Sequence, residues 1–278
     1  MKVAAVQMKF APTLDGNLAK IEQAISTLKR RRVDTALFPE CCTTGYNYDF
    51  SRLRPSDIGH TIERIQEFAS DSQMNLLIGT PLFRQRKLRN CLLVIDRKGR
   101  VEHCYAKCQL TPADRKTFTP GNHIALFEID GITSTSVICH ERRYPELVRL
   151  AAMAGAKILF HPNAGLDTLP VSKNKRGGKD GIAVRAFENA IHYVFANSVG
   201  PQGGVKWSAG DSKIVDASGK TVRLADNQNE QIVTARLDLS QATGKYAKEA
   251  MEHPKFLSST WKEAIRKLRA QARKNGRY

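Results

Sequence analysis

The sequence has no apolar run long enough to cross a membrane as a helix, although hydrophobic residues make up 41% of its 278 residues. Its N-terminus enters a strand-like segment directly, without the apolar core and small-residue cleavage site of a signal peptide. The six cysteines are scattered along the chain, which is typical of reduced thiols and not of a disulfide framework. These absences predict a soluble cytoplasmic protein without a membrane span.

Acidic residues are scarce relative to basic ones, 27 against 44, and the formal net charge is +17. Such an excess can favour nucleic acid, an anionic surface or an anionic substrate. The basic residues are spread through the chain, and no zinc-finger or RNP motif accompanies them. We therefore interpret the charge as mainly solvated surface and do not expect nucleic-acid binding.

The order of the predicted elements indicates one α/β domain over residues 1–278. Apolar runs predict strands at residues 2–7, 35–38, 76–80, 157–160, 193–198 and 232–237, and hairpins over residues 91–105, 124–139 and 212–224. Helical periodicity predicts helices capped by Asn17, around Ile62, after Pro145 and over residues 182–190, with a long loop over residues 165–181. Because buried strands alternate with amphipathic helices, two mixed sheets with helices outside them fit this pattern.

Residues 240–278 form a basic C-terminal extension. Between residues 261 and 278 there are seven Lys or Arg residues against one Glu, and Trp261, Ile265 and Leu268 fall on one helical face. This pattern predicts a surface helix, with a membrane-surface or nucleic-acid role as the less favoured alternative. Trp261 could equally be buried on its own domain or against a partner subunit, so the segment could also exchange between subunits.

Three chemically useful residues stand where predicted strands end: Glu40, Lys107 and Cys139. In open α/β sheets, sites form at the carboxyl ends of strands. A thiol, a carboxylate and an ammonium at one rim suffice for acyl transfer, as nucleophile, proton carrier and oxyanion partner. Cys139 also precedes the helix opened by Pro145, and a thiol in this position can be held as thiolate, its reactive form, by the helix dipole and nearby cations.

The segments around these residues resemble those of the nitrilase or carbon–nitrogen hydrolase superfamily, and the resemblance covers nearly the whole chain. The matching segments are Leu37-Phe38-Pro39-Glu40 with Thr44-Gly45-Tyr46, Tyr105-Ala106-Lys107 with Phe118-Thr119-Pro120-Gly121, Ile138-Cys139-His140-Glu141-Arg142-Arg143-Tyr144-Pro145-Glu146, Pro162-Asn163-Ala164 and Ala196-Asn197-Ser198. Three separated blocks in the right order are far more specific than one short motif.

The resemblance implies an α-β-β-α sandwich with two central mixed sheets, and Glu40, Lys107 and Cys139 as the catalytic triad. It implies hydrolysis of an amide or N-carbamoyl C–N bond through a cysteine thioester with release of ammonia, without metal or organic cofactor. The backbone N–H of His140 would help to hold the oxyanion, and the protein would form a homodimer or a larger homo-oligomer. A nitrilase acting on a small nitrile is the nearest alternative. A non-catalytic protein that binds RNA or acidic partners through its basic surface is an alternative of another class.

Arg142 and Arg143 are similar to the arginine pair that holds the substrate carboxylate in N-carbamoyl-D-amino-acid hydrolases. Because a guanidinium can bind a carboxylate in a bidentate manner, the pair predicts a small carboxylate-bearing substrate, and a surface ion pair is the alternative. Tyr46 and Asn163, in two of the matching segments, are the other expected substrate-binding residues.

Asp114 stands where many members of the superfamily carry a second glutamate. Its side chain is shorter by one methylene, so it could position Lys107 or the substrate, or be only a turn residue. Near Lys107, the spacing of His103, Cys104 and Cys108 fits no common zinc site, and we expect no metal there.

Overall fold

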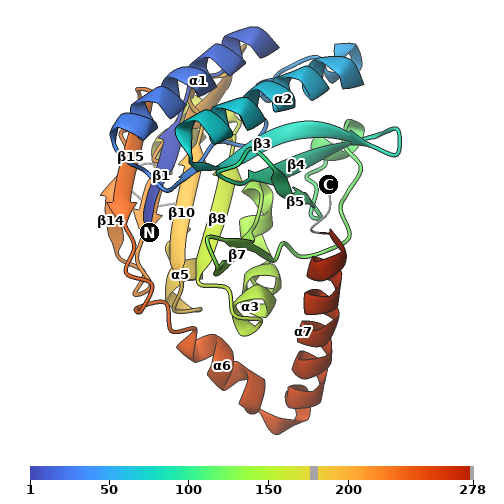
Figure 1. Cartoon of the computed structure of the whole chain (residues 1–278), viewed down its shortest axis with the longest axis vertical. Helices are drawn as coiled ribbons and strands as arrows, with labels where there is room; N and C mark the ends of the chain where they lie inside the picture. The colour runs from blue at the N-terminus through green and yellow to red at the C-terminus, as the bar shows by residue number, and fades with distance from the viewer. Residues whose placement is uncertain (176–180, 276–278) are drawn as a thin grey trace.

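A computed structural model describes residues 1–175 and 181–275 and shows two six-stranded sheets packed against each other (Figure 1). The first sheet has the order β15 (Gln231–Arg236), β1 (Lys2–Gln7), β2 (Thr35–Leu37), β3 (Asn75–Arg84), β4 (Lys87–Ile95) and β5 (Val101–Ala106). The second has the order β14 (Thr221–Leu224), β13 (Lys213–Val215), β10 (His192–Asn197), β8 (Ile158–Asn163), β7 (Ile132–Ser136) and β6 (Phe127–Ile129). A small third sheet joins β11 (Val199–Pro201), β12 (Lys206–Ala209) and β9 (Asp167–Thr168).

The inner strands of both large sheets are buried on two faces, which is why β1 and β3 in the first sheet and β8 and β10 in the second are rich in apolar residues, whereas the edge strand β14 is largely exposed. In β1, Val3 and Ala5 point into the core between the sheets, whereas Ala4 and Val6 point towards the outer helices. In β8, Phe160 lies in the same central core and Leu159 on the opposite face. The alternation of side chains along a strand thus serves two apolar layers at once.

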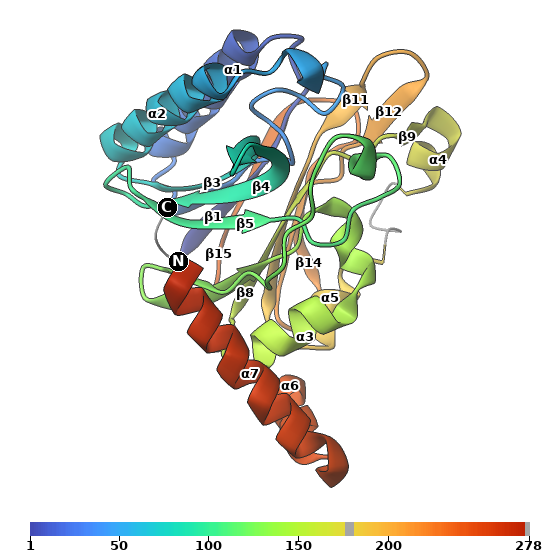
Figure 2. The same cartoon turned by 90° about the vertical axis from the view of Figure 1, so that its right-hand side faces the viewer.

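Helices cover the two outer faces, and this confirms the predicted α-β-β-α sandwich. The first sheet is covered by α1 (Leu14–Arg30) and α2 (Pro55–Ser72). The second is covered by α3 (Pro145–Met153), α5 (Val184–Phe187), α6 (Lys245–Glu252) and α7 (Lys255–Asn275). Figure 2 shows these two groups of helices on opposite sides of the sheets, with α7 extending away from them.

Some predicted boundaries are wrong. The N-cap of α1 is Thr13, whose hydroxyl accepts the Gly16 N–H at 3.1 Å, while Asn17 is buried one turn later and bonds the backbone of Ala11. The predicted loop over residues 165–181 contains β9 and α4 (Leu169–Asn174), although residues 176–180 of that range lie outside the described residues. The helix predicted over residues 182–190 is only the short α5.

The C-terminal helices pack on the chain's own domain. Ile265 and Leu268 are buried, and Trp261 packs beside them against the apolar side of α3. Within the described ranges, no helix has the length and apolar character needed to span a membrane. The exchange of residues 240–278 between subunits and the cytoplasmic location stay predictions.

Strand direction brings the ends of β2, β5 and β7 to one region of the molecule. In the first sheet, β2 is parallel to β3, and β5 is antiparallel to β4, which is itself antiparallel to β3. The carboxyl ends of β2 and β5 therefore point in the same direction and lie at the same end of the strands of that sheet. In the second sheet, β7 is parallel to β8 and β10, and the residues that follow β7 reach the same pocket.

Candidate active site

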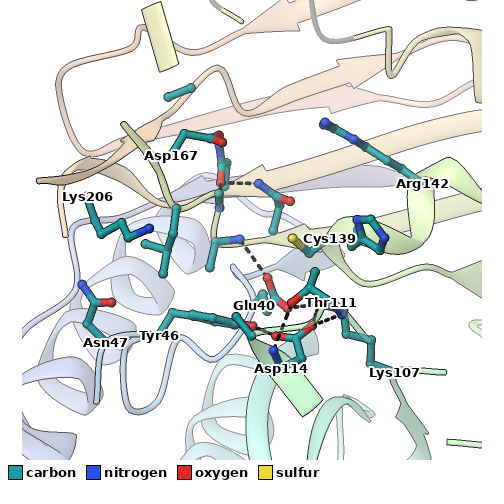
Figure 3. A pocket seen from close by; sticks show the side chains of 18 of the residues that line it. Glu40, Tyr46, Asn47, Lys107, Thr111, Asp114, Cys139, Arg142, Asp167 and Lys206 are labelled. Carbon is teal, nitrogen blue, oxygen red and sulfur yellow. Dashed lines mark hydrogen bonds and ion pairs between the residues drawn. The ribbon is translucent and has the colours of Figure 1, made fainter. Parts of the chain in front are cut away.

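A pocket of about 600 Å³ lies where these strand ends meet, and Glu40, Lys107 and Cys139 all line it (Figure 3). Glu40 follows β2, Lys107 follows β5 and Cys139 follows β7. Three residues that are up to 99 positions apart in the sequence (40 to 139) are thus neighbours in space. The structure brings together all three residues of the predicted triad.

The Glu40 carboxylate is held on both oxygens. Its Oε1 accepts hydrogen bonds from Lys107 Nζ at 2.8 Å and from Asn90 Nδ2 at 2.7 Å, and its Oε2 accepts the Ala164 N–H at 3.1 Å. Glu40 and Lys107 are each 1% exposed, so bulk water does not compete for these bonds. A carboxylate held in this way has one orientation towards the pocket.

Gly79 allows the backbone of Glu40 to sit where it does. A Cβ at position 79 would collide with the carbonyl oxygen of Pro39 and lie 2.7 Å from the Cα of Glu40. Any larger residue would therefore push Glu40 out of its place. A glycine inside the apolar β3 strand is the sequence signal for such a close backbone approach.

Cys139 is the first residue of a short 3₁₀ helix, η3 (Cys139–Arg143), and has a φ of 51°. A non-glycine residue in this left-handed region is uncommon and marks a constrained turn. The turn is fixed by the ring of His161, whose Nε2 lies 3.0 Å from the Cys139 carbonyl oxygen. The side chain is therefore presented to the pocket by a tightly held backbone.

The surroundings of Cys139 favour a neutral thiol over a resting thiolate. Burial, followed by the carboxylate of Glu40, raises the pKa of the Cys139 thiol to about 12, although the Lys107 ammonium acts in the opposite direction. The helix N-terminus considered from the sequence is that of α3, which begins six residues later, after η3. Cys139 is a neutral thiol at pH 7 and needs a base to become nucleophilic.

Asp114 completes a buried cluster of one cation and two carboxylates. Lys107 Nζ lies 2.9 Å from Asp114 Oδ2, and Tyr46 donates its hydroxyl to Asp114 Oδ1. Burial and the Glu40 carboxylate raise the pKa of Asp114 to about 7. Burial alone would lower the pKa of Lys107, but mainly Glu40 and also Cys139 outweigh it, so the pKa of the ammonium is raised and it stays charged.

Asp114 is therefore more than a turn residue. It begins the 3₁₀ helix η2 (Asp114–Lys116), and its Oδ2 also accepts the Thr111 N–H at 2.9 Å. The shorter side chain reaches Lys107 without the extra methylene of glutamate, and Asp114 also lines the pocket. Tyr46, expected to bind substrate, directs its hydroxyl at Asp114.

Glu141 is a residue that sequence reasoning missed. It is fully buried, and its carboxylate accepts the Ile138 N–H at 2.7 Å, the Cys108 N–H at 2.6 Å and the Tyr105 hydroxyl at 2.8 Å. It thereby ties the segment after Lys107 to the segment that carries Cys139. Its position among charged residues gave no signal in the sequence that it turns inward.

Asn90 is a second missed residue. Besides its bond to Glu40, its carbonyl oxygen accepts the Lys107 N–H at 2.8 Å. It therefore positions both members of the ion pair. The signal in the sequence is that Asn90 is a polar residue directly before the apolar run of β4. Its side chain is only 1% exposed in the structure.

The expected substrate-binding residues lie around the same pocket. His140, Arg142 and Arg143 line it from η3 and Asn163 from the end of β8. The amide of Asn163 donates to Asn197 Oδ1 at 2.8 Å, so its orientation is set. Cys42, by contrast, is fully buried in the core beneath α1 and α2, and does not line the pocket.

The arrangement can carry out covalent catalysis by a thiol. A neutral thiol, a carboxylate close enough to raise its pKa, and a buried ammonium share one wall of the pocket. The carboxylate can accept the thiol proton, and the ammonium can stabilise negative charge that develops beside it. The first N–H groups of η3 lack partners within that helix and are available to an oxyanion.

Comparisons with known proteins place relatives of this chain among nitrilases and amidases. A nitrilase from Pyrococcus abyssi is 27% identical over 248 residues, covering 86% of this chain and 90% of that protein. The 2-oxoglutaramate amidase of Bacillus subtilis is 26% identical over 234 residues, covering 81% and 86% of the two chains. An amidase structure from Nesterenkonia sp. AN1 shares the fold with a TM-score of 0.80 at 23% identity, covering 94% and 99% of the two chains.

The family description spans almost the whole molecule. The sequence model of carbon–nitrogen hydrolases matches residues 2–246, which include both large sheets and every residue of the pocket described above. Residues 247–278, with most of α6 and all of α7, lie beyond that match. The chain belongs to the carbon–nitrogen hydrolase family, the enzymes of the nitrilase superfamily.

Proposed function

We propose that this enzyme hydrolyses an amide or N-carbamoyl C–N bond of a small carboxylate-bearing molecule through a thioester on Cys139. The observation that carries the proposal is the placement of the Glu40 carboxylate. It lies 2.8 Å from Lys107 Nζ and close enough to Cys139 to raise the pKa of the thiol. One carboxylate can therefore serve the nucleophile and the leaving group in turn.

In the first half of the reaction, Cys139 Sγ forms a bond to the carbonyl carbon while its proton passes to Glu40. The tetrahedral intermediate then loses its C–N bond, and the nitrogen leaves as ammonia with the proton that Glu40 returns. Because the pKa of the thiol is about 12, proton transfer to Glu40 has to accompany the attack. The product of this half-reaction is a thioester.

In the second half, a water molecule attacks the thioester carbonyl and gives one proton to Glu40. The C–S bond breaks, the acid leaves, and the proton on Glu40 restores the thiol. Both half-reactions pass through an oxyanion, which Lys107 and the backbone N–H of His140 stabilise. Asp114 holds the ammonium of Lys107 in place, and Asn90 holds the carboxylate of Glu40, by the contacts described above.

The basic residues at the pocket support a carboxylate-bearing substrate. Arg142 and Arg143 line the pocket next to Cys139, and no carboxylate of the described ranges forms an ion pair with either. A guanidinium without a protein partner can bind a substrate carboxylate in a bidentate manner. The similarity to a relative named 2-oxoglutaramate amidase also favours an acidic amide. In this proposal Tyr46 and Asn163 complete the substrate contacts.

A turnover panel tests the reaction class. We expect ammonia release from carboxylate-bearing primary amides or N-carbamoyl amino acids, and at most weak release from nitriles of the same chain length. The nitrile alternative has support in the relative that is named a nitrilase, and faster turnover of nitriles than of amides would establish it instead. No turnover of any of the three classes, combined with salt-dependent RNA binding, would favour a binding protein on this scaffold.

The substitution Arg142→Ala tests the carboxylate contact. We expect KM to rise about tenfold to a hundredfold for carboxylate-bearing substrates, because a charged hydrogen-bonding partner is lost, and neutral amides to be turned over as before. Steady-state kinetics on matched acidic and neutral amides measures the difference. Arg223→Ala, on the exposed strand β14, is the control for a simple loss of positive charge. Equal losses on both substrates would show that Arg142 acts only through the structure of η3.

A further inference from the structure

The pocket carries a further cation, besides Arg142 and Arg143, that the carbon–nitrogen chemistry does not use. Lys206, the first residue of β12, lines the pocket, and no carboxylate of residues 1–175 or 181–275 lies within ion-pair distance of its ammonium. The other lysines of the pocket are engaged: Lys107 with Glu40 and Asp114, and Lys175 with Asp167. Lys206 therefore resembles Arg142 in having no carboxylate partner among the residues that the structure describes.

The position of Lys206 is fixed by the small third sheet. Its N–H donates to the Gly203 carbonyl at 3.1 Å, and its own carbonyl accepts the Gln202 N–H at 2.9 Å, which closes the hairpin between β11 and β12. In the ladder between β12 and β9, Lys206 is paired with Thr168, the residue after Asp167. Asp167 is the nearest carboxylate on that strand, and it is already neutralised by Lys175.

Lys206 and Arg142 lie on different sides of the pocket. In Figure 3 the ammonium of Lys206 extends inwards beside Asn47, whereas Arg142 lies on the other side, beyond Cys139. The two carboxylates nearest the thiol, Glu40 and Asp114, face the buried Lys107 and not the mouth. A molecule seated over Cys139 therefore has Lys206 on one side and Arg142 on the other, and Arg143, next to Arg142 in η3, also lines the pocket.

We propose that the substrate carries two anionic groups, one bound by Arg142 and the other by Lys206, with the scissile C–N bond between them at Cys139. This inference rests on the proposed hydrolase function and narrows its substrate to a dicarboxylate amide or carbamoyl compound. Arg142 suits a carboxylate at a set angle, because its guanidinium is planar. Lys206, with four flexible methylenes, suits a second carboxylate whose distance varies.

The walls of the pocket strengthen both contacts. Charges at the mouth of a cleft attract ligands more strongly than the same charges on an open surface, because the protein focuses the field. A hydrogen bond to a charged group in such a place changes affinity by about tenfold or more. A second carboxylate should therefore improve binding measurably.

Calorimetry with simple carboxylates tests the second anion position without requiring turnover. Wild-type protein is titrated with glutarate and adipate and with the monocarboxylates of the same length, pentanoate and hexanoate. We expect at least one dicarboxylate to bind about tenfold more tightly than its monocarboxylate, and Lys206→Ala to reduce that ratio to about one. Lys206→Arg should keep the preference, and Lys220→Ala, on the exposed turn before β14, should leave it unchanged.

The outcomes separate this inference from the hydrolase proposal. Equal affinities for mono- and dicarboxylates, or a preference that survives Lys206→Ala, overturn the role of Lys206 even if acidic amides are hydrolysed. A Lys206-dependent preference in a protein that releases no ammonia from amides, carbamoyl compounds or nitriles overturns the hydrolase proposal instead. Since Lys206 is exposed, its replacement does not disturb the core.

Discussion

Cys139→Ala should reduce ammonia release by at least about 10⁴-fold, because no other described residue that lines the pocket carries a thiol to form the thioester. The substitution removes only the sulfur atom of the side chain, and alanine tolerates the left-handed backbone at φ 51° as well as cysteine does. The folded state should therefore persist, with a change in the free energy of unfolding of about 1 kcal/mol or less. Activity assays and urea unfolding on the same preparation measure the two effects.

A matched cysteine separates the nucleophile from a structural thiol. Cys42→Ala, at a fully buried cysteine that does not line the pocket, should keep turnover while it lowers stability. Mass spectrometry of the wild-type protein with a slow substrate should find the acyl adduct on Cys139. An adduct on Cys42 or Cys108, or undiminished turnover in Cys139→Ala, would contradict the proposed mechanism.

Lys107→Ala should lower both activity and stability, which distinguishes it from Cys139→Ala. The ammonium is the shared partner of Glu40, at 2.8 Å, and of Asp114, at 2.9 Å, and all three side chains are buried. Its removal leaves two buried carboxylates without a cation, which should reduce the free energy of unfolding by about 3–5 kcal/mol. Loss of the oxyanion partner should reduce kcat by about 10²–10³-fold or more.

The stability deficit of Lys107→Ala should depend on pH in a set direction. The pKa of Asp114 is already raised to about 7 by burial and by Glu40, and without the ammonium the two carboxylates should bind protons more readily still. A folded state that binds more protons than the unfolded chain loses stability as pH rises. The deficit should therefore be larger at pH 8 than at pH 5, as measured by urea unfolding.

A second substitution provides the control for this prediction. Adding Asp114→Asn to Lys107→Ala removes one of the unpaired carboxylates, so it should restore part of the stability without restoring activity. A deficit that is the same at both pH values, or a Lys107→Ala protein with normal kcat, would show that the ion-pair cluster has neither role.

Local patterns in the sequence were sufficient for the layers of the fold. Apolar runs such as residues 2–7 and 157–160 form strands because burial on both faces requires them to be apolar, and the helical stripe through Ile58, Ile62 and Ile65 forms α2 for the same reason. Helix caps and short elements were harder to predict from the sequence. The turn between β3 and β4 uses left-handed Gln85 and Arg86, residues that give no turn signal, so that hairpin was missed.

The candidate site divides in the same way. Glu40, Lys107 and Cys139 could be selected because each closes a strand and lies in a segment that resembles a known family. The protonation state of Cys139 could not be predicted from the sequence, because the pKa of its thiol depends on burial and on the carboxylate of Glu40, 99 positions away in the sequence. Asn90 and Glu141 were missed because their roles arise from contacts between distant segments.

The sequence by itself determined the α-β-β-α layering, the family resemblance and the three residues at the strand ends, because periodicity, turn residues and motifs are local properties. Tertiary structure alone decided that Cys139 is a neutral thiol, that Lys107 is shared by two carboxylates, and that Arg142 and Lys206, which have no carboxylate partner among the described residues, line the pocket from different sides. These features depend on distance, burial and the direction of side chains across two sheets. None of those quantities exists until the chain has folded.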